Sequence, residues 1–479
     1  MSLTDSDRPF FGITVLADFI LNEGVDGVLD NLTERAGVTA VALNATVTAE
    51  SEEGKGSFQP PSDAGSSPRL FDRPLWGKRS LWVRSGPSYH PDESLYSDTP
   101  YRPRRPNDLT ASCGDVIGDF IDAALERGLK VYFQLSATAP PGLRDEDRPL
   151  LPDGRPPAGR MADTGSLASD AIRSYTSAHV RDLLAKYPKI TGFRPDWPEY
   201  PCYKLDEAFQ DFSPAVQAWA ERSGKFDFDN IRRDVGALYR YLHGSLTNAD
   251  LEDFIDTDPG EFSQLALVRS SPNFLAWLRL KSALSADLLQ HWRRAITEWG
   301  GEEKELSANA FMPPFSLFTG FDFAAAASCC SAASPKLYTM HWTVIVEFWG
   351  RVLLDRNPGL DEELLVKALA RLFDLGARAD GRESLAAYHY PEPDEPHPVS
   401  AAAQSRKIEL ALAQAQVGGG DMAITPIVHG YGPPGDFLRR FRVVADSRAN
   451  GVWINRYGYL SDEKLDGVGE IWRSKQTDG

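Results

Sequence analysis

Two carboxylates stand among proline and aromatic residues in a short segment, 192–201, near the middle of the chain. Prolines bracket Trp197, so the loop that carries Asp196 and Glu199 has little conformational freedom. Aromatic neighbours exclude water from a carboxyl group and raise its pKa, and such rings also stack on sugars. A carboxylic acid held in this way can protonate the oxygen of a leaving group. We therefore predict that Asp196 and Glu199 are catalytic and that Arg194 and Trp197 bind substrate; the alternative is an Asp196–Arg194 ion pair beside a solvated Glu199.

Two histidines end predicted strands, His341 the sixth and His429 the seventh. An imidazole can act as acid or base near neutral pH, and it can hydrogen-bond to sugar hydroxyls. We predict that both histidines are catalytic and that Trp342, the neighbour of His341, binds substrate. For each histidine the alternative is a buried ring that bonds to a carbonyl group.

Other polar side chains also fall near the ends of predicted strands. Gln134 and Asn309 fit inward positions, from which an amide group can bind substrate hydroxyls. Asn455 and Tyr457 share one face of the eighth predicted strand, because side chains alternate along a strand. We predict that all four bind substrate. The alternatives are structural hydrogen bonds for the first two and packing against helices for the last two.

The elements that must position these residues alternate between strand and helix, which is typical of a parallel sheet covered by helices. Apolar runs bounded by turn residues predict eight strands: Phe11–Leu16, Val38–Asn44, Lys130–Ser136, Ile190–Arg194, Glu305–Phe311, Lys336–His341, Asp421–Val428 and Gly451–Arg456. Apolar residues spaced three and four apart predict helices between them, among them Leu167–Ala185, Phe321–Ala333, Ser400–Val417, Pro434–Ser447 and Asp462–Trp472.

Eight strands with intervening helices fit a closed (β/α)8 barrel better than an open doubly wound sheet. We predict an α/β protein with a TIM barrel, as a single domain over residues 1–479. A loop insertion is expected at 46–110, after the second strand, and a helical insertion at 226–298, between the fourth and fifth strands. In this fold the active site lies at the carboxyl ends of the strands, where the predicted functional residues fall.

The segment Gly192-Phe193-Arg194-Pro195-Asp196 resembles the G-F-R-x-D strand of α-amylase-like glycoside hydrolases. The resemblance implies a barrel glycosidase in which Asp196 is the nucleophile and Arg194 orients it. The α-amylase pattern also has a glutamate after the fifth strand and a histidine–aspartate pair after the seventh, where this chain has Asn309 and only His429. The resemblance therefore extends to glycoside hydrolase-like (β/α)8 barrels as a superfamily and assigns no family. The candidates for a second carboxylate are Glu199, Asp18 and Glu347.

Charge and composition narrow the classes of partner. A formal net charge of −17 disfavours binding to nucleic acid or anionic lipid. No uninterrupted apolar run is long enough to cross a bilayer. The polar amino terminus and four cysteines without CxxC spacing indicate a cytoplasmic protein with reduced thiols. The adjacent cysteines 329 and 330 are expected to pack within the predicted Ala-rich helix.

The sequence as a whole predicts an enzyme, a hydrolase that cleaves a glycosidic bond in a small saccharide or glycoside. Its expected partner is a small carbohydrate, and a homo-oligomer is compatible with the sequence. We predict no cofactor and no metal site, because the chain has no HxH or HExxH spacing. The histidines together with Asp196 and Glu199 leave a divalent-metal sugar isomerase or lyase as the rival. A catalytically inert, carbohydrate-binding barrel is the third alternative, and a phosphorylated substrate also stays open.

Overall fold

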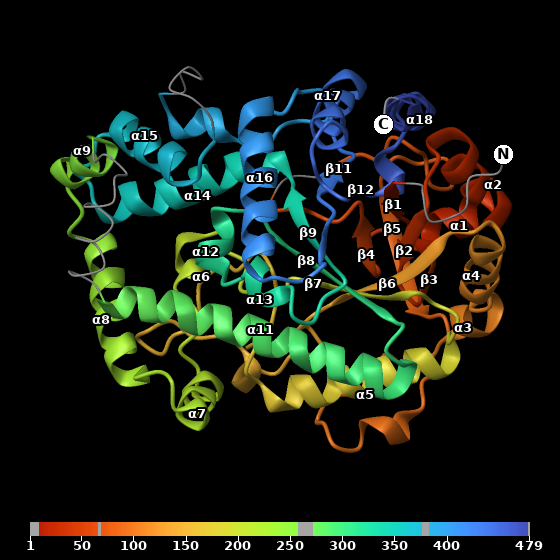
Figure 1. Cartoon of the computed structure of the whole chain (residues 1–479), viewed down its shortest axis with the longest axis horizontal. Coiled ribbons are helices and arrows are strands. Elements are labelled where there is room, and N and C mark those ends of the chain that lie inside the picture. The colour runs from red at the N-terminus through yellow and green to blue at the C-terminus, as the bar shows by residue number, and fades with distance from the viewer. Residues whose placement is uncertain (1–8, 66–68, 257–271, 376–382, 478–479) are drawn as a thin grey trace.

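The computed structural model describes residues 9–65, 69–256, 272–375 and 383–477. Eight parallel strands form its centre (Figure 1): β1 (Phe10–Thr14), β2 (Ala40–Leu43), β6 (Lys130–Ser136), β7 (Gly192–Asp196), β8 (Glu305–Phe311), β9 (Ala332–Leu337), β11 (Ile427–His429) and β12 (Gly451–Asn455). They pair in this order, and β12 pairs back with β1, which closes the sheet. The predicted (β/α)8 barrel is confirmed.

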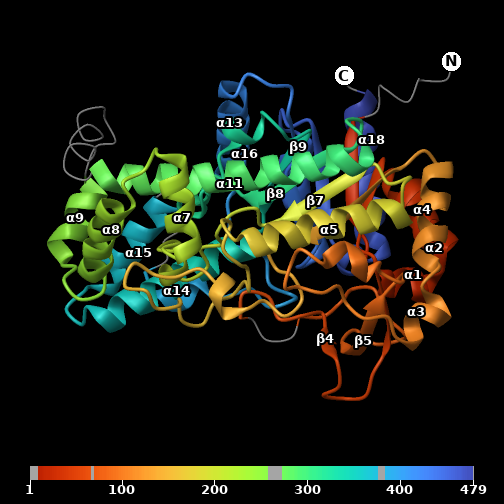
Figure 2. The same cartoon turned by 90° about the horizontal axis from the view of Figure 1, so that it is seen from below.

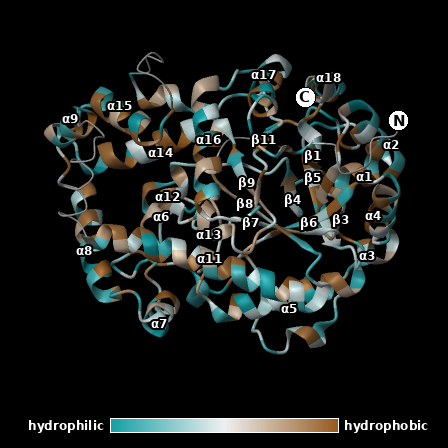
Figure 3. Ribbon diagram, viewed as in Figure 1, coloured by the Kyte–Doolittle hydropathy of each residue, from teal (hydrophilic) through white to brown (hydrophobic). Residues whose placement is uncertain are grey.

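Helices cover the outside of this barrel. They are α1 (Ala17–Glu23) and α2 (Val25–Asp30), α4 (Val116–Glu126), α5 (Asp170–Lys186), α11 (Pro272–Gly300), α13 (Phe323–Ala326), α14 (Thr339–Arg356), α16 (Ala401–Val417), α17 (Pro434–Ala445) and α18 (Asp462–Thr477). The helices carry both hydrophilic and hydrophobic residues (Figure 3), as expected where one face packs on a sheet and the other meets water. No helix in the described part of the chain is long and apolar enough to span a membrane.

The lumen of the barrel is packed with side chains. Tyr132 and Trp453 lie there with four smaller or aliphatic side chains: Ala40 and Ala42 on β2, Ile427 on β11 and Met340 at the start of α14. The Trp453 ring fits only because residue 12 on β1 is a glycine. A Cβ at this position would lie 2.3 Å from the ring. Gly12 therefore lets the largest side chain of this layer fit inside the barrel.

The sixth strand differs from its prediction. We expected a helix over Phe321–Ala333 and a strand over Lys336–His341, but α13 ends at Ala326 and the strand is Ala332–Leu337. Alanine favours a helix in isolation, yet the pairing of this segment with β8, Ala332 opposite Ser307, closes the barrel. Tertiary pairing outweighs the local propensity here.

Because the helix and the sixth strand have other bounds than predicted, two pairs of residues lie in other elements than expected. His341 and Trp342 lie in the first turn of α14 instead of in a strand. Cys329 and Cys330 lie in a turn after α13, with their sulfurs 4.0 Å apart and not bonded. The predicted strands Lys130–Ser136 and Glu305–Phe311 have the same bounds in the structure, and the predicted seventh strand is divided into β10 (Ala423–Ile424) and β11.

The two segments that we expected to be insertions contain regular structure. Residues 46–110 include an antiparallel sheet of β3 (Thr46–Glu50), β5 (Leu81–Pro87) and β4 (Ser57–Gln59), which projects from the body of the molecule (Figure 2). Residues 226–298 include α8 (Phe228–Leu242), α9 (Asn248–Asp256) and most of α11. Helices α8, α9 and α15 (Glu362–Leu372) gather at the end of the molecule opposite the chain termini (Figure 1).

Candidate active site

Asp196 lies at the carboxyl end of β7 and forms an ion pair with a lysine on β9. Lys336 Nζ is 2.6 Å from Asp196 Oδ1 and 4.2 Å from the centre of the Trp197 ring. The lysine side chain is 4% exposed, whereas the aspartate is 25% exposed and faces the barrel mouth. Burial lowers the pKa of Lys336, although the Asp196 carboxylate opposes this effect. Asp196 therefore has one carboxylate oxygen paired with Lys336, and part of its side chain is accessible to solvent.

Glu199 is fully buried beneath the same loop. Its Oε1 accepts a hydrogen bond from the backbone N–H of Phe311, at 2.6 Å, and its Oε2 accepts one from the Thr319 hydroxyl. Burial raises the pKa of this carboxyl group to about 7, and these hydrogen bonds limit the rise. Glu199 thus ties the loop after β7 to the end of β8 and to α12 (Phe315–Thr319).

His341 lies on the other side of the mouth and uses both ring nitrogens. Nδ1 is 3.0 Å from the Tyr203 hydroxyl, and Nε2 is 2.7 Å from Asp63 Oδ2. Asp63 also lies 3.2 Å from Arg69 and accepts a hydrogen bond from Tyr390. Burial alone would raise the pKa of Asp63, but His341 and Arg69 hold it well below its usual range. Asp63 is therefore an ionised carboxylate that orients His341.

Aromatic rings lie between the two sides of the mouth. The rings of Trp197 and Tyr203 are 6.3 Å apart, and the Tyr203 and Tyr338 rings lie 5.1 and 5.2 Å from that of His341. Trp197 is partly exposed, and its Nε1–H has no acceptor among the described residues. Gln134 also has an unpaired polar atom, because its Oε1 is buried and no donor in the described part of the chain reaches it. These two buried polar atoms therefore have unused hydrogen-bonding capacity beside the mouth.

Arg194 and Asn309 lie deeper in the lumen than Asp196. The guanidinium group donates 2.9 Å and 2.6 Å hydrogen bonds to Ser307 and Asn309 and stacks 3.6 Å from the centre of the Trp453 ring. Both residues are completely buried. Burial lowers the pKa of Arg194 to about 9. The Asp196–Arg194 ion pair that we considered does not form, since Lys336 takes that place.

The other predicted site residues are dispersed. Asn455 accepts a 2.8 Å hydrogen bond from Thr14 inside the barrel rim. Tyr457 lies beyond the strand, where its hydroxyl bonds to Glu23, and Trp342 is fully buried beside Lys407. Neither of these two rings reaches the mouth.

His429 is buried at the rim beside Arg69. Its Nδ1 accepts a hydrogen bond from the Tyr431 N–H, and its Nε2 is 3.4 Å from Arg69. Burial first, and then the Arg69 charge, hold the pKa of His429 well below its usual range. The ring is therefore neutral near pH 7, which suits an acceptor better than an acid.

Two of the main charges at this site, Lys336 and Asp63, were not predicted as site residues. Lys336 begins a predicted strand, and only the barrel register points its ammonium group at Asp196. Asp63 lies in the 46–110 segment that we predicted as a loop insertion, 278 positions from His341. The one local signal for Lys336 was a lysine at the start of a predicted strand. Among the described residues, no group of three or more His, Cys, Asp or Glu side chains is arranged to hold a metal ion.

No protein-family model matches this chain, and no curated protein matches it by sequence. Solved structures do match it. The β-galactosidase from the psychrophilic Marinomonas ef1 superposes with a TM-score of 0.50 at 13% identity, over 97% of this chain and 59% of that one. The catalytic domain of the β-amylase from Paenibacillus polymyxa gives 0.45 at 10% identity, over 98% of this chain and 97% of that one. The GH5_18 protein from Streptomyces cattleya, in complex with GlcNAc, gives 0.42 at 12%, over 98% and 81%.

This chain thus spans about three fifths of the β-galactosidase that it resembles. The similarity to that structure shows a shared (β/α)8 barrel of the kind found in glycoside hydrolases. The comparison bears out the predicted barrel fold and assigns no specific family. Function is a separate question, because one barrel fold supports many reactions.

Proposed function

We propose that the chain hydrolyses a glycosidic bond in a small saccharide or glycoside, with Asp196 and His341 as the catalytic residues. The observation that carries the proposal is the arrangement at the barrel mouth. A half-buried carboxylate on one side faces a carboxylate–imidazole pair on the other, with aromatic rings between them. Most glycosidases place two carboxyl groups on either side of the scissile bond, and in this proposal the His341–Asp63 pair takes the place of the second carboxyl group.

Asp196 has the role of nucleophile or of base toward water. The Lys336 ammonium group, 2.6 Å away, stabilises the ionised carboxylate, and 25% of the side chain is exposed toward substrate. An anionic carboxylate also stabilises the positive charge that develops on the sugar ring in the transition state. Lys336 is a positioning residue in this scheme, because it acts through Asp196.

His341 has the role of proton donor to the leaving oxygen, through Nδ1–H, when that oxygen takes the place of the Tyr203 hydroxyl that Nδ1 contacts in the structure. The ionised Asp63 orients the ring through Nε2 and pairs with its protonated form. Trp197 and Gln134 bind sugar hydroxyls with the polar atoms that lack protein partners. Glu199 has no free oxygen for substrate and is assigned a positioning role, beneath the loop that carries Asp196.

Leaving-group dependence tests these roles. A nitrophenolate leaves without a proton, whereas an alkoxide needs one, so acid catalysis matters only for the second. Asp196→Asn should lower kcat/KM by about 1,000-fold on both nitrophenyl and alkyl glycosides, since it removes a group needed in every case. His341→Asn should retain most activity on nitrophenyl glycosides and lose about 100-fold or more on alkyl glycosides.

The matched control is Asp122→Asn, which removes an aspartate from a surface ion pair with Lys189. It should leave both activities unchanged. The proposal fails if the wild-type protein cleaves none of a panel of α- and β-linked aryl glycosides, or if Asp196→Asn is as active as the wild type. Activity that vanishes on chelation would favour the metal-dependent isomerase or lyase instead.

A further inference from the structure

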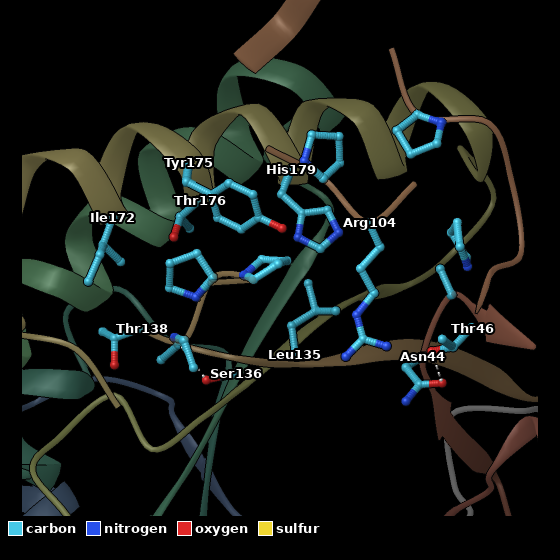
Figure 4. Close-up of a pocket in the computed structure, with 18 of the residues that line it drawn as sticks. Asn44, Thr46, Arg104, Leu135, Ser136, Thr138, Ile172, Tyr175, Thr176 and His179 are labelled. Atoms are coloured by element: carbon cyan, nitrogen blue, oxygen red, sulfur yellow. Dashed lines mark hydrogen bonds between the residues drawn. The ribbon is translucent and has the colours of Figure 1, made fainter. Parts of the chain in front are cut away.

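A cavity of about 400 Å³ lies beside the proposed active site, between the ends of β2 and β6 and helix α5. We call it the α5 pocket. Ile172, Tyr175, Thr176 and His179 line it from α5, and Figure 4 shows these side chains facing Leu135, Ser136 and Thr138 across the space. Prolines 87, 91, 103, 140 and 141 form much of the remaining wall. The backbone around the pocket is therefore stiff, which suits a preformed binding site.

The α5 pocket adjoins the strand that carries Asp196. Ser136 pairs with Asp196 across β6 and β7, and the next residue, Ala137, donates its N–H to the Asp196 carbonyl, at 2.9 Å. Gln134, whose buried Oε1 has no donor in the described part of the chain, lines the pocket from the lumen side. The pocket therefore lies one strand away from Asp196, close enough to hold another part of the same substrate.

The charge of the α5 pocket is opposite to that of the protein. The chain carries 68 acidic and 51 basic residues, yet none of the residues that line the pocket is Asp or Glu. Arg104, an exposed residue, is its one charged lining residue, and no ion-pair partner for it occurs in the described part of the chain. Its guanidinium group donates a hydrogen bond to the Ser85 hydroxyl, at 3.5 Å.

Neighbouring groups do not cancel this charge. Burial, and then the Arg104 guanidinium, lower the pKa of His179 to about 4, so that this ring is a neutral hydrogen-bonding group at pH 7. The nearby Asp182 is buried behind the wall, where it accepts hydrogen bonds from the Tyr89 and Tyr96 hydroxyls. In Figure 4 the Arg104 guanidinium extends into the space below His179.

We infer that the α5 pocket is a subsite that binds an anionic group of the substrate, a carboxylate or a phosphate, through Arg104. An unpaired guanidinium binds either group with charge-assisted hydrogen bonds. His179, Thr176 and Ser136 supply further polar contacts around it. The inference rests on the proposed function, and it narrows the substrate to an acidic or phosphorylated saccharide.

Binding measured without turnover tests this inference. Glucuronate, glucose 6-phosphate and glucose are titrated calorimetrically into the full chain at low salt, which separates a carboxylate, a phosphate and a neutral probe. We expect one or both charged probes to bind at least about tenfold more tightly than glucose. Arg104→Met should abolish that preference, a loss of about 10- to 100-fold for the charged probe. Arg105→Met is the control, because it removes the same charge from the next residue, which does not line the pocket.

Equal affinities for charged and neutral probes would overturn the inference, as would a preference for charge that survives Arg104→Met. The two proposals fail separately. An Arg104-dependent preference in a protein that cleaves no glycoside supports the subsite and refutes the hydrolase. Cleavage of neutral and acidic aryl glycosides at equal rates, unchanged in Arg104→Met, supports the hydrolase and refutes the subsite.

Discussion

The Glu199→Gln variant tests whether the Glu199 carboxyl group positions the active-site loop or takes part in catalysis. Glu199 is completely buried, and its carboxyl group has a pKa of about 7, against an ordinary value of 4.5. Folding therefore favours the protonated form, which is the opposite of the usual effect on an acidic residue. The wild-type protein loses stability from this group as the pH rises through the window between 4.5 and about 7, and the loss is complete above it.

The width of this pH window sets how much stability the wild-type protein loses through Glu199. At about 1.4 kcal/mol per pH unit, the loss in unfolding free energy amounts to about 3 kcal/mol between pH 4.5 and pH 8. Glutamine has the shape of the protonated acid and never ionises. It can accept from the Phe311 N–H and donate to the Thr319 hydroxyl, which then donates to the Ser316 carbonyl, 3.3 Å away. The variant should therefore gain up to about 3 kcal/mol over the wild type as the pH rises from 4.5 to 8.

Urea titrations followed by tryptophan fluorescence, on both proteins at pH 4.5, 6 and 8, measure this difference. Comparing the two proteins at each pH removes the contributions of all other titrating groups. A difference in unfolding free energy that stays constant from pH 4.5 to 8 would show that Glu199 does not titrate in this range. Glycosidase activity is the second measurement, since a positioning role predicts a kcat within about tenfold of wild type, whereas the loss of an acid or base costs about 100-fold or more.

Two further predictions concern the rim and the lumen of the barrel. Asp63→Asn should destabilise the protein by about 2 kcal/mol or more at pH 6, because it leaves the buried Arg69 without its carboxylate partner. Because the pKa of Asp63 is depressed, the stabilisation by its carboxylate is present above pH 3.8 and is lost as the pH falls below that value. Urea titrations of both proteins at pH 6 and pH 3 measure this loss. An equal difference in unfolding free energy at the two pH values would contradict the prediction. Gly12→Ala should cost about 1–3 kcal/mol, because its Cβ would overlap the Trp453 ring at 2.3 Å. Gly27→Ala, whose Cβ would meet nothing closer than 3.9 Å, should be neutral or stabilising, and equal thermal midpoints for the two variants would show that the lumen is not tightly packed.

Local sequence patterns predicted most of the barrel strands and the position of Asp196 at the barrel mouth. The strands at Lys130–Ser136 and Glu305–Phe311 are apolar runs bounded by turn residues, and they fold as such. Asp196 could be placed at the mouth, because the end of its strand and the loop after it are adjacent in the sequence. The sixth strand was misplaced, because its alanines carry a helical preference that only pairing with β8 overrides.

Other assignments depended on side-chain directions that no local pattern contains. Tyr457 was expected in the lumen from the alternation of its strand, but the chain leaves the strand at Asn455 and turns the ring toward Glu23. Glu199 and Asp196 are three residues apart, yet one is completely buried and the other faces the mouth. A tight loop after a strand end sends successive side chains to different surroundings.

The alternation of strands and helices can be recognised along the chain, and it implies the barrel and the edge at which polar side chains collect. The residue types at that edge, among them Asp196, Trp197 and His341, can be recognised in the same way. Their partners depend on the folded arrangement. Lys336 reaches Asp196 across the lumen, and Asp63 reaches His341 from a loop 278 positions away, because closing a barrel brings together strand ends and loops that are remote in the sequence. Those contacts set the charge and burial of each group, and so its proposed chemical role.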